Sequence, residues 1–155
     1  KREAIDRDVV PSLIESLEAA TTLLQGLTRT EPARKVFEDV RDRLRAARCY
    51  FTTMRNSVAW TESVHGYMEA QSMSEKERYR SLCRAMVISE LENAKNLLKL
   101  WNESNVDWLP VSTFGESLHI YGENFGDLVH RKITLMQNHI DDEPYIDPEY
   151  MWRMK

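Results

Sequence analysis

Cysteine, glycine and proline are scarce in this chain of 155 residues, which contains two Cys, five Gly and five Pro. The shortage of glycine and proline excludes collagen-like, linker-like and glycine-rich low-complexity proteins. Two cysteines can form a single disulfide bond, which crosslinks too little of a chain of this size to make a disulfide scaffold. We interpret Cys49 and Cys83 as buried free thiols that pack as small apolar side chains. The alternative is a single bridge between neighbouring helices, which would require their Cα atoms to lie within about 7 Å.

Long apolar runs and an excess of basic residues are also absent. The chain has 21 Lys and Arg against 25 Asp and Glu, a net charge of −4, so we expect no nucleic-acid partner, whose phosphates require a basic surface. No apolar run reaches the roughly 18 residues of a membrane-spanning segment, so we expect no membrane partner. The composition, 42% apolar and 30% charged, is typical of one soluble globular domain. The chain begins Lys1-Arg2-Glu3-Ala4 without an apolar signal segment; we expect it to be processed or cut from a longer protein, and its localisation stays open.

Helical periodicity is what the sequence has in abundance. Apolar residues recur at intervals of three and four over four segments. This pattern predicts an all-α fold, a four-helix up-down bundle in which the second and third helices form a long central antiparallel pair, because their connection is short. The expected helices cover residues 8–27, 30–69, 74–101 and 123–139. The apolar face expected for the last of these consists of Phe125, Leu128 or Val129, Ile133, Met136 and Ile140.

The second predicted helix carries one continuous apolar stripe, which we expect the other helices to cover. Thr30 is its predicted N-cap, and Ser74 with Glu77 is the predicted capping box of the third helix. The stripe consists of Val36, Val40, Leu44, Ala47, Phe51, Met54 and Val58.

Two segments fall outside this helical pattern. Residues 102–122 contain proline, glycine and large apolar residues, which predicts an ordered loop that folds back or carries function. Pro144 and Pro148 prevent a regular helix near the C-terminus. We therefore divide the chain into a helical bundle domain, 1–140, and an aromatic C-terminal tail, 141–155, that docks on the bundle or on a partner. The candidate interface residues, which either anchor these segments or contact another domain, are Trp108, Tyr121, Tyr145 and Trp152.

A metal site is an alternative that rests on two Glu-x-x-His motifs. Glu62 with His65 and Glu116 with His119 have the i,i+3 spacing that puts both side chains on one face of a helix, as in ferritin-like bundles with two metal ions. The second pair lies between Gly115 and Gly122 and need not be helical. The remaining ligands would be Glu15 or Glu18 and Glu90 or Glu92. Glutamate is so frequent here that such motifs also arise by chance, and the alternative is a set of ordinary polar surface residues.

Catalytic motifs are absent from the sequence. It contains no His-Glu-x-x-His, no Gly-x-Ser-x-Gly and no glycine-rich phosphate loop. A glycosidase would need two facing carboxylates in a cleft, and we expect no such cleft in a small four-helix chain. We therefore assign no catalytic residue and no cofactor, and expect the protein to act by contact.

A family resemblance adds a functional expectation. The segments that carry it are ENAKNLLKL (92–100), GE (115–116), YGENF (121–125) and KITLMQNH (132–139). Residues 79–152, about half of the chain, resemble the helical region that follows the catalytic barrel in some large bacterial glycoside hydrolases. The resemblance implies a non-catalytic accessory domain of a carbohydrate-active enzyme that packs against the barrel, mediates dimerisation or forms the rim of a sugar site.

Two other functions stay open beside the accessory domain. One is the free-standing metal-binding bundle described above. The other is an adaptor bundle whose apolar groove binds a partner helix. The expected partner is accordingly another domain of the parent protein, a separate protein or a second copy of this chain.

Overall fold

The computed structural model describes residues 2–25, 31–104 and 124–147, and these ranges contain four helices and no strand. The all-α prediction is confirmed for this part of the chain, whereas the up-down order of the four helices stays a prediction. No helix in these ranges is both long and apolar enough to cross a membrane. The helices are α1 (Arg2–Gln25), α2 (Glu31–Glu69), α3 (Met73–Glu103) and α4 (Phe125–Asn138).

The helix ends differ from the prediction at several points. α1 begins six residues earlier than residue 8, and α3 continues to Glu103, so residues 102 and 103 are helical and do not belong to the predicted loop. Residues 105–122 of that loop and the predicted N-cap Thr30 lie outside the described residues.

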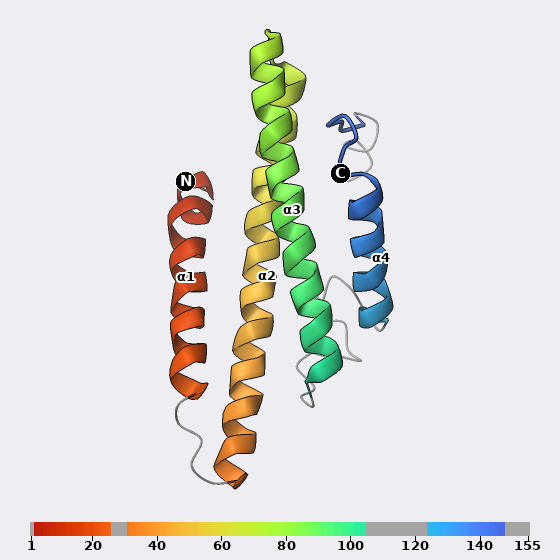
Figure 1. Ribbon diagram of the computed structural model, residues 1–155. Coiled ribbons are helices and arrows are strands. Elements are labelled where there is room, and N and C mark those ends of the chain that lie inside the picture. The colour runs from red at the N-terminus through yellow and green to blue at the C-terminus, as the bar shows by residue number, and fades with distance from the viewer. Residues whose placement is uncertain (1, 26–30, 105–123, 148–155) are drawn as a thin grey trace, which may run out of the picture.

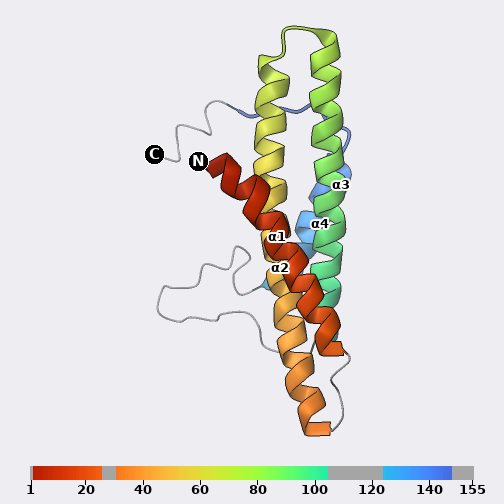
Figure 2. The same cartoon turned by 90° about the vertical axis from the view of Figure 1, so that its left-hand side faces the viewer.

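The helices stack in three layers around a central pair. α2 and α3 run side by side, α1 lies on one face of this pair and α4 on the opposite face (Figure 1, Figure 2). Backbone contacts join α1 to α2 and α4 to α3, and none joins α1 to α4 in the part of the chain that the structure describes. Among the described helices, none lies along one long side of α2.

Side-chain contacts show that α2 and α3 are antiparallel. As the residue numbers rise along α2, the numbers of their partners fall along α3. The joined pairs are Asp42 with Ser104, Cys49 with Asn93, Thr53 with Glu90, and Asn56 with Ser89.

Polar and small residues form the seam between α2 and α3. Asp42, Cys49, Asn56 and Ser63 are all buried and recur every seven residues, which is the spacing that keeps one helix face against a long partner helix. The predicted apolar stripe is not this face. Val36, Val40 and Met54 are exposed, and the remaining stripe residues are half-buried. The prediction that other helices cover the stripe is wrong for Val36, Val40 and Met54, because it took apolarity alone to mark the packed face.

The cap of α3 lies two residues before the predicted capping box. Ser72 Oγ accepts a hydrogen bond from the amide of Glu75 at 3.2 Å, and the amide of Ser72 donates to Glu75 Oε2 at 3.1 Å. The amide of Gln71 also donates to this carboxylate, at 3.1 Å. Glu75 thus satisfies two backbone donors of the turn, which explains why the cap forms here and not at Ser74.

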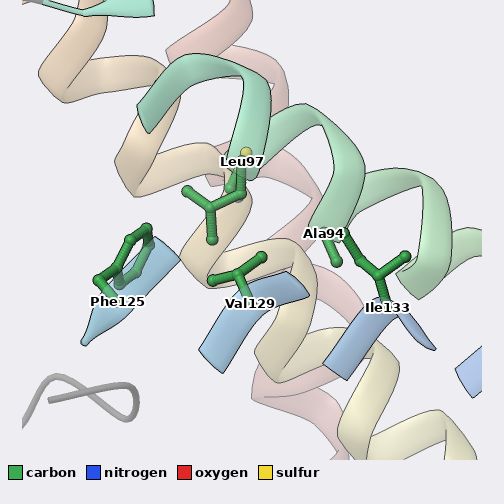
Figure 3. Close-up of a cluster of buried hydrophobic side chains, with 6 residues drawn as sticks. Ala94, Leu97, Phe125, Val129 and Ile133 are labelled. Atoms are coloured by element: carbon green, nitrogen blue, oxygen red, sulfur yellow. The ribbon is translucent and has the colours of Figure 1, made fainter. Parts of the chain in front are cut away.

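The apolar core lies between α3 and α4. Phe125, Val129 and Ile133 follow one another on successive turns of α4 and point at Ala94 and Leu97 of α3 (Figure 3). Cys49 of α2 completes this cluster. The buried face of α4 is the one that its apolar spacing predicted.

A close approach between the helices explains a glycine inside α2. A Cβ atom at Gly66 would overlap the aromatic ring of Tyr79 in α3. Glycine at this position costs helix propensity, on the order of 1 kcal/mol relative to alanine. It allows the ring to lie directly on the α2 backbone, near the turn that joins the two helices.

Candidate interaction surfaces

The four predicted interface aromatics divide between described and undescribed parts of the chain. Trp108, Tyr121 and Trp152 lie outside the described residues. Tyr145 is described: its side chain is 65% exposed, and it stands at the edge of a groove. Of the four proposed interface residues, Tyr145 is thus the one that can be placed, and it lies on an accessible surface.

The proposed metal ligands do not come together in the part of the chain that the structure describes. Glu62 is exposed on α2 and His65 is half-buried, while Glu116 and His119 lie outside the described residues. Among the other proposed ligands Glu15, Glu18 and Glu92 are exposed, and Glu18 pairs with Arg48 of α2. No group of three His, Cys, Asp or Glu side chains in the described ranges is arranged to hold a metal ion.

Glu90 has a different role from the one proposed for it. Its carboxylate is 5% exposed and accepts hydrogen bonds from Thr53 Oγ1 at 2.6 Å and Asn56 Nδ2 at 2.7 Å. The amide of Asn93 approaches it at 3.5 Å, and the ammonium group of Lys132 in α4 forms an ion pair with it. The carboxylate therefore has donors on α2, α3 and α4, and these contacts compensate the cost of burying its charge.

Sequence reasoning named Glu90 but missed Lys132, its partner. Lys132 is more than 40 residues from Glu90 in the sequence and belongs to a different helix. Its side chain lies on the edge of the apolar face of α4. One signal was available. In the sequence, Glu90 stands midway between Cys83 and Leu97 in a row with a spacing of seven residues. The structure shows that all three are buried, and a buried charged residue in such a row needs an ion-pair partner.

Both cysteines are buried free thiols, as predicted, and the alternative of a bridge between them is wrong. Burial raises the pKa of Cys49 to about 11, and burial likewise raises the pKa of Cys83. Because the thiolate is the nucleophilic form, two thiols that are buried and protonated at neutral pH are poor nucleophiles in the folded protein. Their contribution is packing, in the core for Cys49 and in a groove wall for Cys83.

The first candidate surface is the side of α2 that faces away from α3. Four large apolar side chains lie there within about 80° of helical arc, at 100° per residue. We call this row the open face of α2. Its members are Val36, Val40, Tyr50 and Met54, with exposed fractions of 62%, 39%, 44% and 42%.

The second candidate surface is a groove of about 1080 Å³ bounded by α2, α3, α4 and the segment that follows α4. The sequence predicted no cleft in which facing carboxylates could act, and it gave no sign of this groove, because the groove combines residues of four segments that share no motif. Glu90 and Lys132 also line it. Its apolar lining comes from Trp60, Met86, Val87, Leu135, Met136 and Ile140.

The segment after α4 closes one side of this groove. Its conformation is irregular, as the prolines predicted. Glu143 accepts a hydrogen bond of 2.5 Å from the hydroxyl group of Tyr67, a buried residue of α2. This hydrogen bond raises the pKa of Tyr67 above its ordinary value, so the phenol remains a donor at neutral pH.

Comparison with known proteins gives no relative. No family model, no curated protein and no solved structure matches this chain significantly.

Proposed function

We propose that this chain is a non-catalytic helical interaction domain that docks on another folded domain through the open face of α2. The observation that carries the proposal is the exposure of Val36, Val40, Tyr50 and Met54 in one row. Scattered exposed apolar residues are ordinary, but an aligned row on one face of a long helix is typical of an interface.

The polar residues of the fold support a structural role more than a chemical one. The carboxylate of Glu90 already has donors on three helices, so it has little capacity left to move a proton or bind an ion. The raised pKa of both cysteines also argues against a nucleophile. Contact remains the activity that these side chains fit best.

The resemblance noted in the sequence indicates which partner to test first. In glycoside hydrolases with a helical region after the barrel, that region packs on the catalytic domain. We therefore propose an accessory domain of a carbohydrate-active enzyme, with the barrel of the same polypeptide as the partner. A homodimer through the same face is the competing arrangement.

Site-specific photo-crosslinking tests this proposal. A benzoylphenylalanine placed at Tyr50, in the longest natural polypeptide that carries this sequence, is expected to crosslink to one contiguous surface of another domain. The matched control is Ile88, which is 47% exposed but lies on α3 away from the open face, and its crosslinks are expected to be absent or scattered.

Two results would overturn the inter-domain proposal. Crosslinks from position 50 that are as sparse and scattered as those from position 88 would show that the open face contacts nothing. Crosslinks from position 50 to α2 of a second copy would identify that copy, and not the barrel, as the partner of the open face. Adding Met54→Glu, which places a charge in the middle of the row, should abolish whichever specific crosslink is seen.

A further inference from the structure

We propose that residues 139–147 form a strap that closes one side of the groove and is released without unfolding of the helices. The strap and the groove are distinct from the open face of α2, so this inference does not depend on the function proposed above. Its evidence is the path of the segment, the kind of contacts that hold it and the surface that it adjoins.

The path of the strap crosses the central pair of helices. α4 ends in a tight turn, in which the amide of Asp142 donates to the carbonyl of His139 at 3.2 Å and the two side chains meet at 2.6 Å. From this turn the chain passes α3 and reaches Tyr67 on α2, as the blue segment in Figure 2 shows. The strap thus connects all three helices that bound the groove.

Side-chain contacts at exposed positions hold the strap in place. Arg84 Nε donates to Asp141 Oδ1 at 3.1 Å, and Arg80 approaches the carbonyl oxygen of Asp141 at 3.4 Å. The side chains of Arg84 and Asp141 are 54% and 76% exposed, and an ion pair so accessible to water stabilises little. The hydrogen bond from the buried Tyr67 to Glu143 is the better sheltered anchor.

The surface beside the strap is a hollow and not a close-packed core. Leu135 and Trp60, two of the apolar side chains in the groove, remain partly exposed, and Tyr145 of the strap does not fill the space. Segments that bury little apolar surface and depend on exposed contacts open at a low free-energy cost. Release of the strap is therefore expected to widen access to those apolar walls of the groove that are still covered.

Cys83 provides a reporter for this opening, and Cys49 an internal control. Cys83 lines the groove yet is 5% exposed, whereas Cys49 belongs to the core between α3 and α4. The probe is N-ethylmaleimide, with the labelling rate of each cysteine measured by mass spectrometry under native conditions. Because Cys83 and the strap line the same groove, we expect opening of the strap to expose the first thiol, whereas only unfolding of the helices should expose the second.

We expect Tyr67→Phe to increase the labelling rate of Cys83 about fivefold, the effect of losing one hydrogen bond. Glu143→Gln removes the charge of the acceptor but keeps an amide oxygen that accepts a weaker hydrogen bond from Tyr67, so it should increase the rate by less. The rate of Cys49 should not change. Glu77→Gln is the matched control, because Glu77 also lines the groove and the change removes the same charge without touching an anchor. Asp141→Asn, which removes the negative charge of the exposed anchor to Arg84, should act in the same direction with a smaller effect.

Two outcomes would contradict the strap. If Cys83 is labelled at the wild-type rate in Tyr67→Phe, Glu143→Gln and Asp141→Asn, these contacts do not restrain access to the groove. If both cysteines accelerate together in these variants, the anchors stabilise the whole fold and there is no separately released strap.

Discussion

Replacing Phe125 by alanine is expected to lower the free energy of unfolding by about 4 kcal/mol, the cost of truncating a fully buried aromatic residue. The side chain is 1% exposed, and its ring lies against Trp101 with centroids 4.8 Å apart. α4 has only 14 residues and attaches to α3 through three buried side chains, so the loss removes a large share of its contact. Urea denaturation followed by circular dichroism measures the change.

A neighbouring residue of α4 gives the control for this prediction. Leu128 is 38% exposed, so Leu128→Ala should cost less than about 1 kcal/mol. Equal effects at the two positions would show that α4 does not dock through the face assigned to it. Hydrogen exchange should also show α4 opening in Phe125→Ala while α2 and α3 keep their protection.

The second large effect is expected from Lys132→Met, which should lower the free energy of unfolding by about 3 kcal/mol. The substitution leaves the carboxylate of Glu90 buried among α2, α3 and α4 without the cation that neutralises it. The penalty comes from the uncompensated charge and not from the loss of packing, since methionine retains most of the apolar stem. The same denaturation experiment measures it.

A second substitution separates these two causes. Glu90→Gln removes the charge and keeps a group that can hydrogen-bond Thr53 and Asn56, so adding it to Lys132→Met should recover at least about 1 kcal/mol. Lys99→Met serves as the control, because Lys99 pairs with Glu103 at an exposed i,i+4 position and should cost less than about 0.5 kcal/mol. If Lys132→Met were as mild as Lys99→Met, the buried ion pair would not stabilise the fold.

The sequence predicted the helices well because each helix is encoded locally. The spacing of Phe125, Val129 and Ile133 correctly marked the buried face of α4. α2 was harder to read, since its face toward α3 contains Asp42 and Asn56. These residues are buried because specific partners on another helix satisfy them, and a pattern of apolar residues cannot reveal such partners.

The candidate surfaces depend even more on tertiary contacts. Tyr145 was proposed as an interface residue from its place in a proline-containing aromatic tail, which is a local signal, and the structure shows only that it is exposed. The groove was missed, because its walls combine residues of α2, α3, α4 and the strap that share no motif. The open face of α2 was visible as an apolar stripe, but only the position of α3 shows that much of this stripe lies outside the core.

Hydroxyl-radical footprinting tests the central claim most directly. This claim is that α2 packs on α3 through its polar seam, while the open face of α2 lies on the surface of the protein. In the monomeric chain Tyr50 and Met54 should be oxidised rapidly, while the buried Tyr67 and Phe125 are protected. Protection of Tyr50 and Met54 to the level of Phe125 in that monomer would contradict the account, because the open face would then be the packed face of α2.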